Sequence, residues 1–530
     1  MGGAATDRVV IVGAGLAALS AALALAPFPV LVLSPEPLGE GASSAWAQGG
    51  VAAALKAPDS PAIHAADTIR AGAGLVDAVV AHRVVQEAGE HVRILADLGT
   101  PFDRSAEGGY VLSREAAHSF ARVVRVRGDQ AGAAIMRHLA AAVRATPSVQ
   151  VLEGVRAVAL ETAGGEVCGL RLESAAPGGS EAVVLRAPAV LLAGGGSGGL
   201  YALTTNPRRI RGEAIGLAAR AGAVIADAEF VQFHPTAIDI GEDPAPLATE
   251  ALRGEGAVLR NRDGERFMFS VHPDAELAPR DVVARAIFLQ SRAGLRPVLD
   301  ATSLGPRLRE QFPALVAACA RAGIDPVQEP VPVAAAAHYH MGGIATDERG
   351  RTSLRGLWAC GECASTGLHG ANRLASNGLL EALVFARACA GDIRDAIGPA
   401  GCLGAPPLRL PALRPLPQGH ALAAQEDARL RALRRMMTDH VGVVRDGSGL
   451  RRALAAIAGL EAAAPPPSEA FRNICATATL IAAAALLREE SRGAHFRSDF
   501  PAPRGEIGQR SRLTLDEALA LRRQCEREMT

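Results

Sequence analysis

A short apolar strand, a glycine-rich turn and an apolar helix follow one another near the start of the chain. Residues 8–12 are a β-branched run that predicts a buried parallel strand, and they stop at Gly13-Ala14-Gly15-Leu16-Ala17-Ala18. A helix rich in alanine and leucine follows to about Leu25, and residues 30–33 predict a second strand. In this context a G-x-G-x-x-A turn holds a pyrophosphate on a helix N-terminus, so we expect a dinucleotide site, with an ordinary α/β turn as the alternative.

Two later segments repeat the strand-then-glycine pattern. Residues 189–193 predict a buried strand that runs into Gly194 and Gly195, and residues 356–362 repeat the pattern. Three chain segments that converge on one site suit the long FAD better than NAD, so we expect FAD. The acidic ribose ligand stays open, because Ser34-Pro35 stands between the second strand and Glu36.

The composition excludes several classes of protein. Hydrophobic residues make up 49% of the 530 residues and charged residues 21%, which excludes wholesale disorder. The 55 basic and 55 acidic residues cancel, so nothing indicates nucleic-acid binding. No apolar run reaches the roughly 18 residues that span a bilayer, and the longest covers residues 476–487. We therefore expect no membrane segment, and eight scattered cysteines without a secretory leader favour the reducing cytoplasm.

Changes in composition along the chain predict its domains. Proline-rich residues 236–335 predict an inserted unit, and residues 405–417 predict a linker to amphipathic helices. We expect an α/β fold: a Rossmann-like FAD-binding domain with an inserted α+β capping domain and a C-terminal helical domain. The predicted bounds are 1–235 and 336–404 for the FAD-binding domain, 236–335 for the capping domain and 418–530 for the helical domain.

Further along the chain stand several strings rich in glycine, histidine and arginine. They are residues 47–50 (AQGG), 204–207 (TTNP), 232–236 (QFHPT), 249–256 (TEALRGEG), 279–281 (PRD), 338–343 (HYHMGG) and 367–381 (GLHGANRLASNGLLE). These strings resemble the flavoprotein family of succinate dehydrogenases and fumarate reductases, and within it the branch that oxidises L-aspartate. They keep the family order over about residues 7–385, and residues 490–495 (ESRGAH) extend the resemblance into the tail.

The resemblance implies a set of FAD contacts. These are Gly13, Ala14, Gly15, Leu16, Ser43, Ser44, Ala47, Gln48, Gly49, Gly50, Ala157, Glu213, Glu362, Gly378 and Leu379. Succinate dehydrogenases attach FAD through a histidine just before the AQGG string. Residues 43–46 (SSAW) contain no histidine, so the resemblance implies noncovalent FAD.

The resemblance also implies a dicarboxylate site and a hydride transfer between a substrate carbon and flavin N5. Substrate contacts carry over to Glu115, His234, Thr249, His338, Arg373 and Ser376, and a proton relay carries over to Arg280, Glu250 and Arg253. Arginine offers a bidentate fork for a carboxylate. Since free arginine titrates near ~12.5–13.8, the relay needs strong coupling between its members.

One residue carries most of the choice of substrate. Glu115 lies in residues 113–119 (SREAAHS), which resemble the segment that faces the amine of L-aspartate. A carboxylate there favours aspartate over succinate by charge complementarity. The implied reaction converts L-aspartate to iminoaspartate, with O₂ (giving H₂O₂) or fumarate reoxidising the flavin. It is the first step of NAD biosynthesis, and the product passes to quinolinate synthase.

The chain departs from the family pattern at three points. Gly-Asp-Gly is Gly212-Glu213-Ala214, the second serine of Ser-Asn-Ser-Leu-Leu-Glu is Gly378, and Ala-Thr-Gly-Gly is Ala193-Gly194-Gly195-Gly196. Cys360 and Cys363 form a C-x-x-C pair that coincides with the flavin string around Glu362, so a redox or zinc role is not favoured.

Two other functions stay open as alternatives. The first is the flavoprotein subunit of a fumarate reductase or succinate dehydrogenase, against which Glu115 and the absent histidine speak. The second is a catalytically silent flavin-binding scaffold, against which His234, His338, Arg280 and Arg373 speak.

Overall fold

The computed structural model describes residues 3–398, 406–416 and 419–529, and its centre is a five-stranded parallel sheet. The order is β18-β11-β2-β3-β7. These strands are β2 (Val9–Val12), β3 (Val30–Ser34), β7 (Val149–Glu153), β11 (Val190–Leu192) and β18 (Leu357–Ala359). The strands before all three glycine-rich turns are therefore neighbours, which confirms the predicted α/β architecture.

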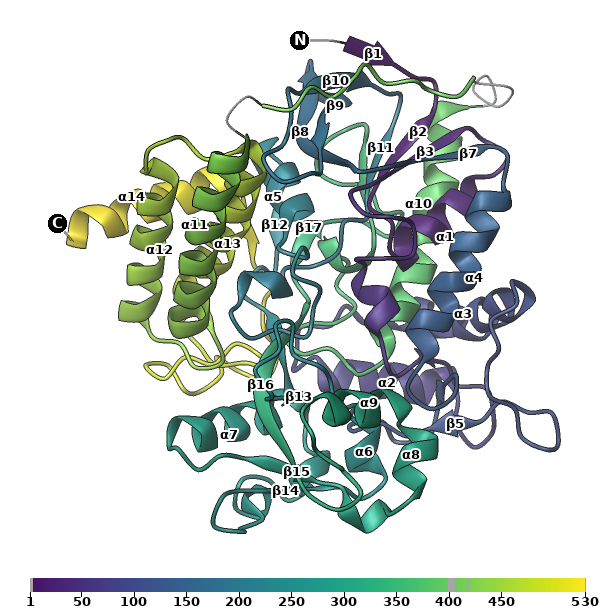
Figure 1. Cartoon of the computed structure of the whole chain (residues 1–530), viewed down its shortest axis with the longest axis vertical. Helices are drawn as coiled ribbons and strands as arrows, with labels where there is room; N and C mark the ends of the chain where they lie inside the picture. Colours follow the sequence, from purple (N-terminus) through teal and green to yellow (C-terminus); the bar gives the residue numbers. More distant parts are fainter. Residues whose placement is uncertain (1–2, 399–405, 417–418, 530) are drawn as a thin grey trace.

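Both faces of this sheet are buried. Successive side chains of a strand point to opposite faces, and Val9 and Ile11 accordingly join one core while Val10 joins another. The first core contains the helices that lie side by side in Figure 1. They are α1 (Leu16–Leu25), α3 (Ala78–Asp97), α4 (Ala131–Ala145) and α10 (Asn377–Ile397).

A β-meander contributes to the second core. Its sheet has the order β1-β10-β9-β8. The strands are β1 (Gly3–Ala5), β8 (Val155–Ala163), β9 (Glu166–Ser174) and β10 (Val183–Arg186). Smaller elements complete the α/β part: α2 (Pro61–Ala71), β4 (Val51–Ala52), β5 (Leu112–Ser113), β6 (Val123–Val124), β12 (Ile225–Ala226), β17 (Gly343–Ala345), β19 (Ala364–Ser365) and β20 (Arg512–Leu513).

A separate apolar core, from Ile238 to Val333, forms the unit at the bottom of Figure 1. We call it the capping unit. Its antiparallel sheet has the order β13-β16-β15-β14, and strands β13 and β16 run from it toward the rest of the protein. Its elements are β13 (Val231–Ile238), α6 (Ala251–Gly254), β14 (Val258–Arg260), α7 (Arg280–Arg292), β15 (Val298–Asp300), α8 (Arg307–Gln311), α9 (Pro313–Arg321) and β16 (Val331–His340).

Within described residues 419–529, the C-terminal part at the left of Figure 1 consists mainly of four helices. They are α11 (Gly419–Val441), α12 (Gly447–Ala462), α13 (Glu469–Leu487) and α14 (Leu515–Met529). Helix α13 packs on α5 (Glu213–Arg220) of the α/β part. It is long and apolar enough to cross a membrane, but 83% of its apolar window is buried inside the protein. The predicted domain bounds at 404 and 418 lie outside the described residues.

Candidate active site

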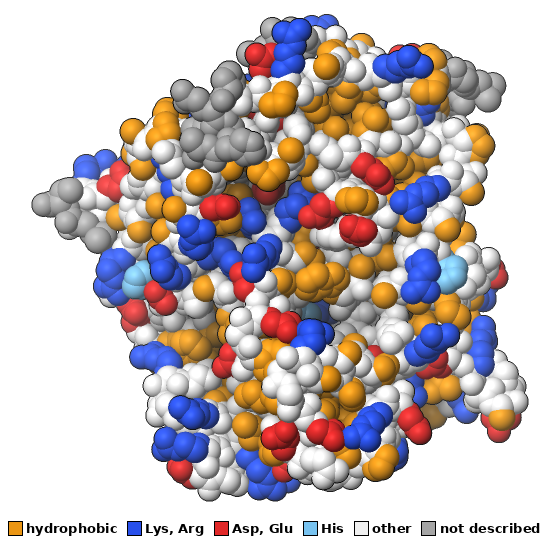
Figure 2. Space-filling view, in the orientation of Figure 1, with side chains coloured by type: hydrophobic (Ala, Val, Ile, Leu, Met, Phe, Trp, Pro, Cys, Tyr) orange, Lys and Arg blue, Asp and Glu red, His pale blue; other side chains and the backbone are white. Residues whose placement is uncertain are grey.

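A cavity of about 780 Å³ opens between the central sheet and the capping unit. Figure 2 shows the surface hollowed above the capping unit. Residues of all three glycine-rich turns line the cavity, together with residues of β13, β16 and the N-terminus of α10. A cavity of this size is typical of a cofactor site.

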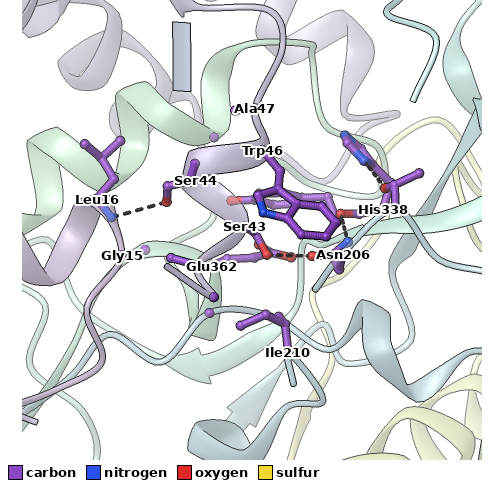
Figure 3. Close-up of a pocket in the computed structure, with 18 of the residues that line it drawn as sticks. Gly15, Leu16, Ser43, Ser44, Trp46, Ala47, Asn206, Ile210, His338 and Glu362 are labelled. Atoms are coloured by element: carbon purple, nitrogen blue, oxygen red, sulfur yellow. Dashed lines mark hydrogen bonds between the residues drawn. The ribbon is translucent and has the colours of Figure 1, made fainter. Parts of the chain in front are cut away.

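The first turn has the geometry that a pyrophosphate needs. Gly13 has a φ of +118°, and a Cβ on it would lie 2.3 Å from the carbonyl oxygen of Ala193. Gly15 is the N-cap of α1, and as a glycine it has no side chain to cap the helix. Figure 3 shows Ser44 beside this turn, where its Oγ accepts from the amide of Leu16 at 3.2 Å. The remaining N–H groups at the helix start are thus free to bind a phosphate.

Every residue predicted to contact FAD lines this cavity, so the residues present fit the cofactor. Ser43 donates to Asn206 at 2.9 Å, and Glu362 accepts from the amide of His340 at 3.0 Å. Burial raises the pKa of Glu362 to about 7. Sequence reasoning assigned Ser43 and Ser44 to FAD but gave no role to Trp46 in the same stretch, whose indole lies in the cavity (Figure 3).

Two histidines from neighbouring strands line the other end of the cavity. His234 on β13 and His338 on β16 have ring centroids 4.9 Å apart. The amide of Thr236 donates to His234 Nδ1 at 3.2 Å, which leaves the hydrogen on Nε2. Burial, together with the charge of Arg280, holds the pKa of both histidines well below the usual value. They are therefore neutral hydrogen-bond donors at physiological pH.

Arg373 lies at the same end of the cavity as Arg280. Its guanidinium lies 4.5 Å from the ring centroid of Tyr339, and its buried Nε has no hydrogen-bond partner among the described residues. Burial, and then the charge of Arg280, lowers the pKa of Arg373 to about 10, so it remains charged at neutral pH. A buried cation with an unused donor fits an anionic ligand.

The predicted proton relay is a continuous chain of contacts. Glu250 accepts from Arg280 Nε at 2.5 Å through one carboxylate oxygen and from Arg253 Nη2 at 3.0 Å through the other. Burial alone would raise the pKa of Glu250, but the charges of Arg280 and Arg253 together outweigh burial. The pKa is therefore lowered, and Glu250 is charged. Arg280 and Glu250 line the cavity, whereas Arg253 lies behind Glu250.

Sequence reasoning missed a glutamine that links both arginines. Gln232 Oε1 accepts from Arg280 Nη1 at 3.1 Å, and its Nε2 donates to the backbone oxygen of Arg373 at 2.8 Å. Gln232 stands two residues before His234 on β13, so its side chain points to the same face of the strand. The two-residue spacing between Gln232 and His234 was the sequence signal that could have identified Gln232 as a site residue.

The predicted amine contact lies in the same cavity. Glu115 is 3% exposed, and Ser376 Oγ donates to its Oε2 at 2.9 Å. Burial, and then the charge of Glu250, raises the pKa of Glu115. A Cβ on Gly49 would lie 2.5 Å from Glu115 Oε1, so this glycine leaves space for the carboxylate. The structure thus brings together all the predicted substrate residues, including Thr249, along the wall of one cavity.

Comparison with known proteins agrees with this geometry. The family described as FAD binding domain matches residues 8–379, and the fumarate reductase flavoprotein C-terminal family matches residues 469–521. An L-aspartate oxidase of Caulobacter vibrioides is 56% identical over 96% of both chains. One of Agrobacterium fabrum is 48% identical over 97% of this chain and 95% of its own. The chain belongs to the L-aspartate oxidase family.

Solved structures of related flavoproteins share the fold of this chain. A quinol fumarate reductase of E. coli has a TM-score of 0.82 and 28% identity, covering 95% of this chain and 93% of its own. The resemblance to the flavoproteins of succinate dehydrogenases and fumarate reductases is thereby confirmed, and FAD is the cofactor of this fold.

Two departures from the L-aspartate oxidase family pattern explain each other. A Cβ on Gly194 would lie 2.6 Å from the Cβ of Ala214. The family's threonine at position 194 therefore needs its glycine at position 214. This chain has glycine at position 194, which leaves room for alanine at position 214. The third departure, Gly378, faces the ring of Tyr339, whose Cε2 would lie 2.8 Å from a Cβ on this residue.

The C-x-x-C pair has no feature of a reactive site. Cys360 and Cys363 are fully buried, and burial raises the pKa of Cys363 to about 12. Reactive thiols have lowered pKa values. No group of three or more potential metal ligands occurs in the described part of the chain.

Proposed function

We propose that this chain oxidises L-aspartate to iminoaspartate with bound FAD. The observation that carries the proposal is the placement of Glu115 in a cavity that also contains Arg280, Arg373 and two neutral histidines. The cations and histidines suit two carboxylates, and Glu115 suits the ammonium group between them.

The chemistry divides between cofactor and protein. FAD, when bound, supplies the acceptor for the hydride that leaves the substrate carbon. Arg373, with its unused Nε donor, binds and orients one carboxylate, and His234 and His338 donate to the substrate from fixed strands. The contacts from Arg280 through Glu250 to Arg253 give the released proton a route away from the cavity.

The same proposal covers the product and the second substrate. Fumarate has the two carboxylates of L-aspartate and fits the same residues, so either O₂ or fumarate serves as the final acceptor. Iminoaspartate passes to quinolinate synthase in NAD biosynthesis. We place this reaction in the cytoplasm, where the free cysteines stay reduced.

The test is peroxide formation by the purified, FAD-reconstituted protein. We expect L-aspartate to yield one equivalent of H₂O₂ per oxoacid formed after hydrolysis, and succinate to yield none. A protein that stays colourless with FAD contradicts the proposal. So does a yellow protein that reduces fumarate with an artificial electron donor but gives no peroxide with L-aspartate, which favours the fumarate reductase alternative.

A further inference from the structure

His118 joins the two loops that carry the proposed amine contacts. It lies between β5 and β6 and is 2% exposed. Its backbone amide donates to the carbonyl oxygen of Glu115 at 3.3 Å, and its ring Nε2 lies 3.0 Å from the carbonyl oxygen of Ala375. Ala375 precedes Ser376, which donates to Glu115. His118 therefore contacts both sides of the Glu115–Ser376 pair, although it does not line the cavity.

The neighbours of the ring fix its tautomer. Arg122 Nη1 lies 3.2 Å from His118 Nδ1. Since a guanidinium can only donate, Nδ1 accepts and the hydrogen is on Nε2, which donates to the Ala375 carbonyl. Burial, followed by the nearby His64 and Arg122, lowers the pKa of His118 to about 3, so the ring stays neutral.

Arg122, which contacts this ring, is itself fixed by hydrogen bonds. It is fully buried, and it donates to Asp59 Oδ2 at 2.9 Å and to Asp67 Oδ2 at 2.7 Å. Asp67 also accepts from the amide of Ser119 at 2.8 Å, in the loop that carries His118. Charged hydrogen bonds, which are the strong ones, thus fix the loop immediately after the histidine.

The Ser376 side needs such a restraint. Ser376 has a φ of +61°, a conformation that costs a non-glycine residue free energy and persists only where the surroundings impose it. The Glu115–Ser376 pair is also tightly enclosed, since a Cβ on Gly49 would lie 2.5 Å from Glu115 Oε1 and 2.9 Å from Ser376 Oγ. A shift of either loop therefore moves the carboxylate relative to the cavity.

We propose that His118 is a positioning residue for recognition of the substrate amine. It holds Glu115 and Ser376 in place and so sets the preference for amino dicarboxylates over dicarboxylates without an amine. This inference rests on the proposed function.

The test compares two variants of the holoenzyme. We expect His118→Ala to lower kcat/KM for L-aspartate about tenfold through KM, because one hydrogen bond to a strained loop is lost. The competitive inhibition constant of succinate, which has no amine, stays unchanged. His118→Gln keeps a donor near the Nε2 position and restores most of the loss. His91→Ala removes another buried histidine, outside the cavity, and should leave both constants unchanged.

A double-mutant cycle separates this inference from the proposed function. If His118 acts through Glu115, adding His118→Ala to Glu115→Gln costs little more than Glu115→Gln alone. Additive losses, or an equal weakening of succinate, overturn the positioning role. A Glu115→Gln protein with unchanged constants instead overturns the amine contact itself. If His118→Ala fails to bind FAD, His118→Asn, too short to reach the Ala375 carbonyl, replaces it in the same cycle.

Discussion

Gly194 and Ala214 should behave as a coupled pair. Gly194→Ala places a Cβ 2.6 Å from that of Ala214, about an ångström inside the roughly 3.5–4.0 Å of ordinary carbon contacts. The φ of Gly194 lies outside the left-handed region, so the backbone accepts alanine and the contact alone opposes it. Overpacking of this kind costs about 1–3 kcal/mol. Ala214→Gly removes the obstructing methyl group at a helix-propensity cost of about 1 kcal/mol.

The assay is the unfolding free energy of the holoprotein, with the dissociation constant of FAD as a second measurement. We expect Gly194→Ala in the Ala214→Gly background to cost almost nothing, which makes the coupling free energy about 1–3 kcal/mol. Gly459→Ala is the control, because it lies in α12 with open space around its Cβ, and it should be neutral or stabilising. A double variant whose loss equals the sum of the single losses would refute the steric reasoning.

Three further outcomes follow from the site. Arg280→Leu should lower kcat by about 10²–10⁴-fold, the usual effect of losing a proton-transfer group, while the flavin absorbance of the purified protein is retained. Glu115→Gln should raise KM for L-aspartate by about ten- to a hundredfold without weakening succinate, because a charged hydrogen bond is worth about 1.5–3 kcal/mol. Asp129 accepts from the amides of Ala314 and Leu315, and burial raises its pKa to about 6, so its charge destabilises the folded state above that pH. Asp129→Asn should therefore stabilise the protein at pH 8 by up to about 3 kcal/mol and leave it unchanged at pH 4, as thermal unfolding will measure.

The sequence predicted the cavity wall better than the contacts behind it. Residues inside long matched strings, such as His234 and Arg373, could be assigned because each string fixes a local backbone as well as a side chain. Gln232 and His118 stood in the same strings but received no role, because their partners lie far along the chain. The tail was predicted only as amphipathic helices after a linker. Among the described residues it has a break between α11 and α12, where Gly442 follows the end of one helix and Asp446 caps the start of the next.

The sequence by itself determined the dinucleotide turn, because a continuous apolar run and the place of glycine are local properties of the chain. The repeat of this pattern in two later segments pointed to FAD. Resemblance of its strings to the family added the predicted substrate and FAD contacts, all of which line the cavity, but not Trp46. Only the tertiary structure decided what those residues can do. Burial keeps the histidines neutral, and two arginines keep Glu250 charged. The contact between positions 194 and 214 explains why the chain departs from the family pattern at both positions together. These effects depend on distances between residues that are remote in sequence, and desolvation and sterics act through space.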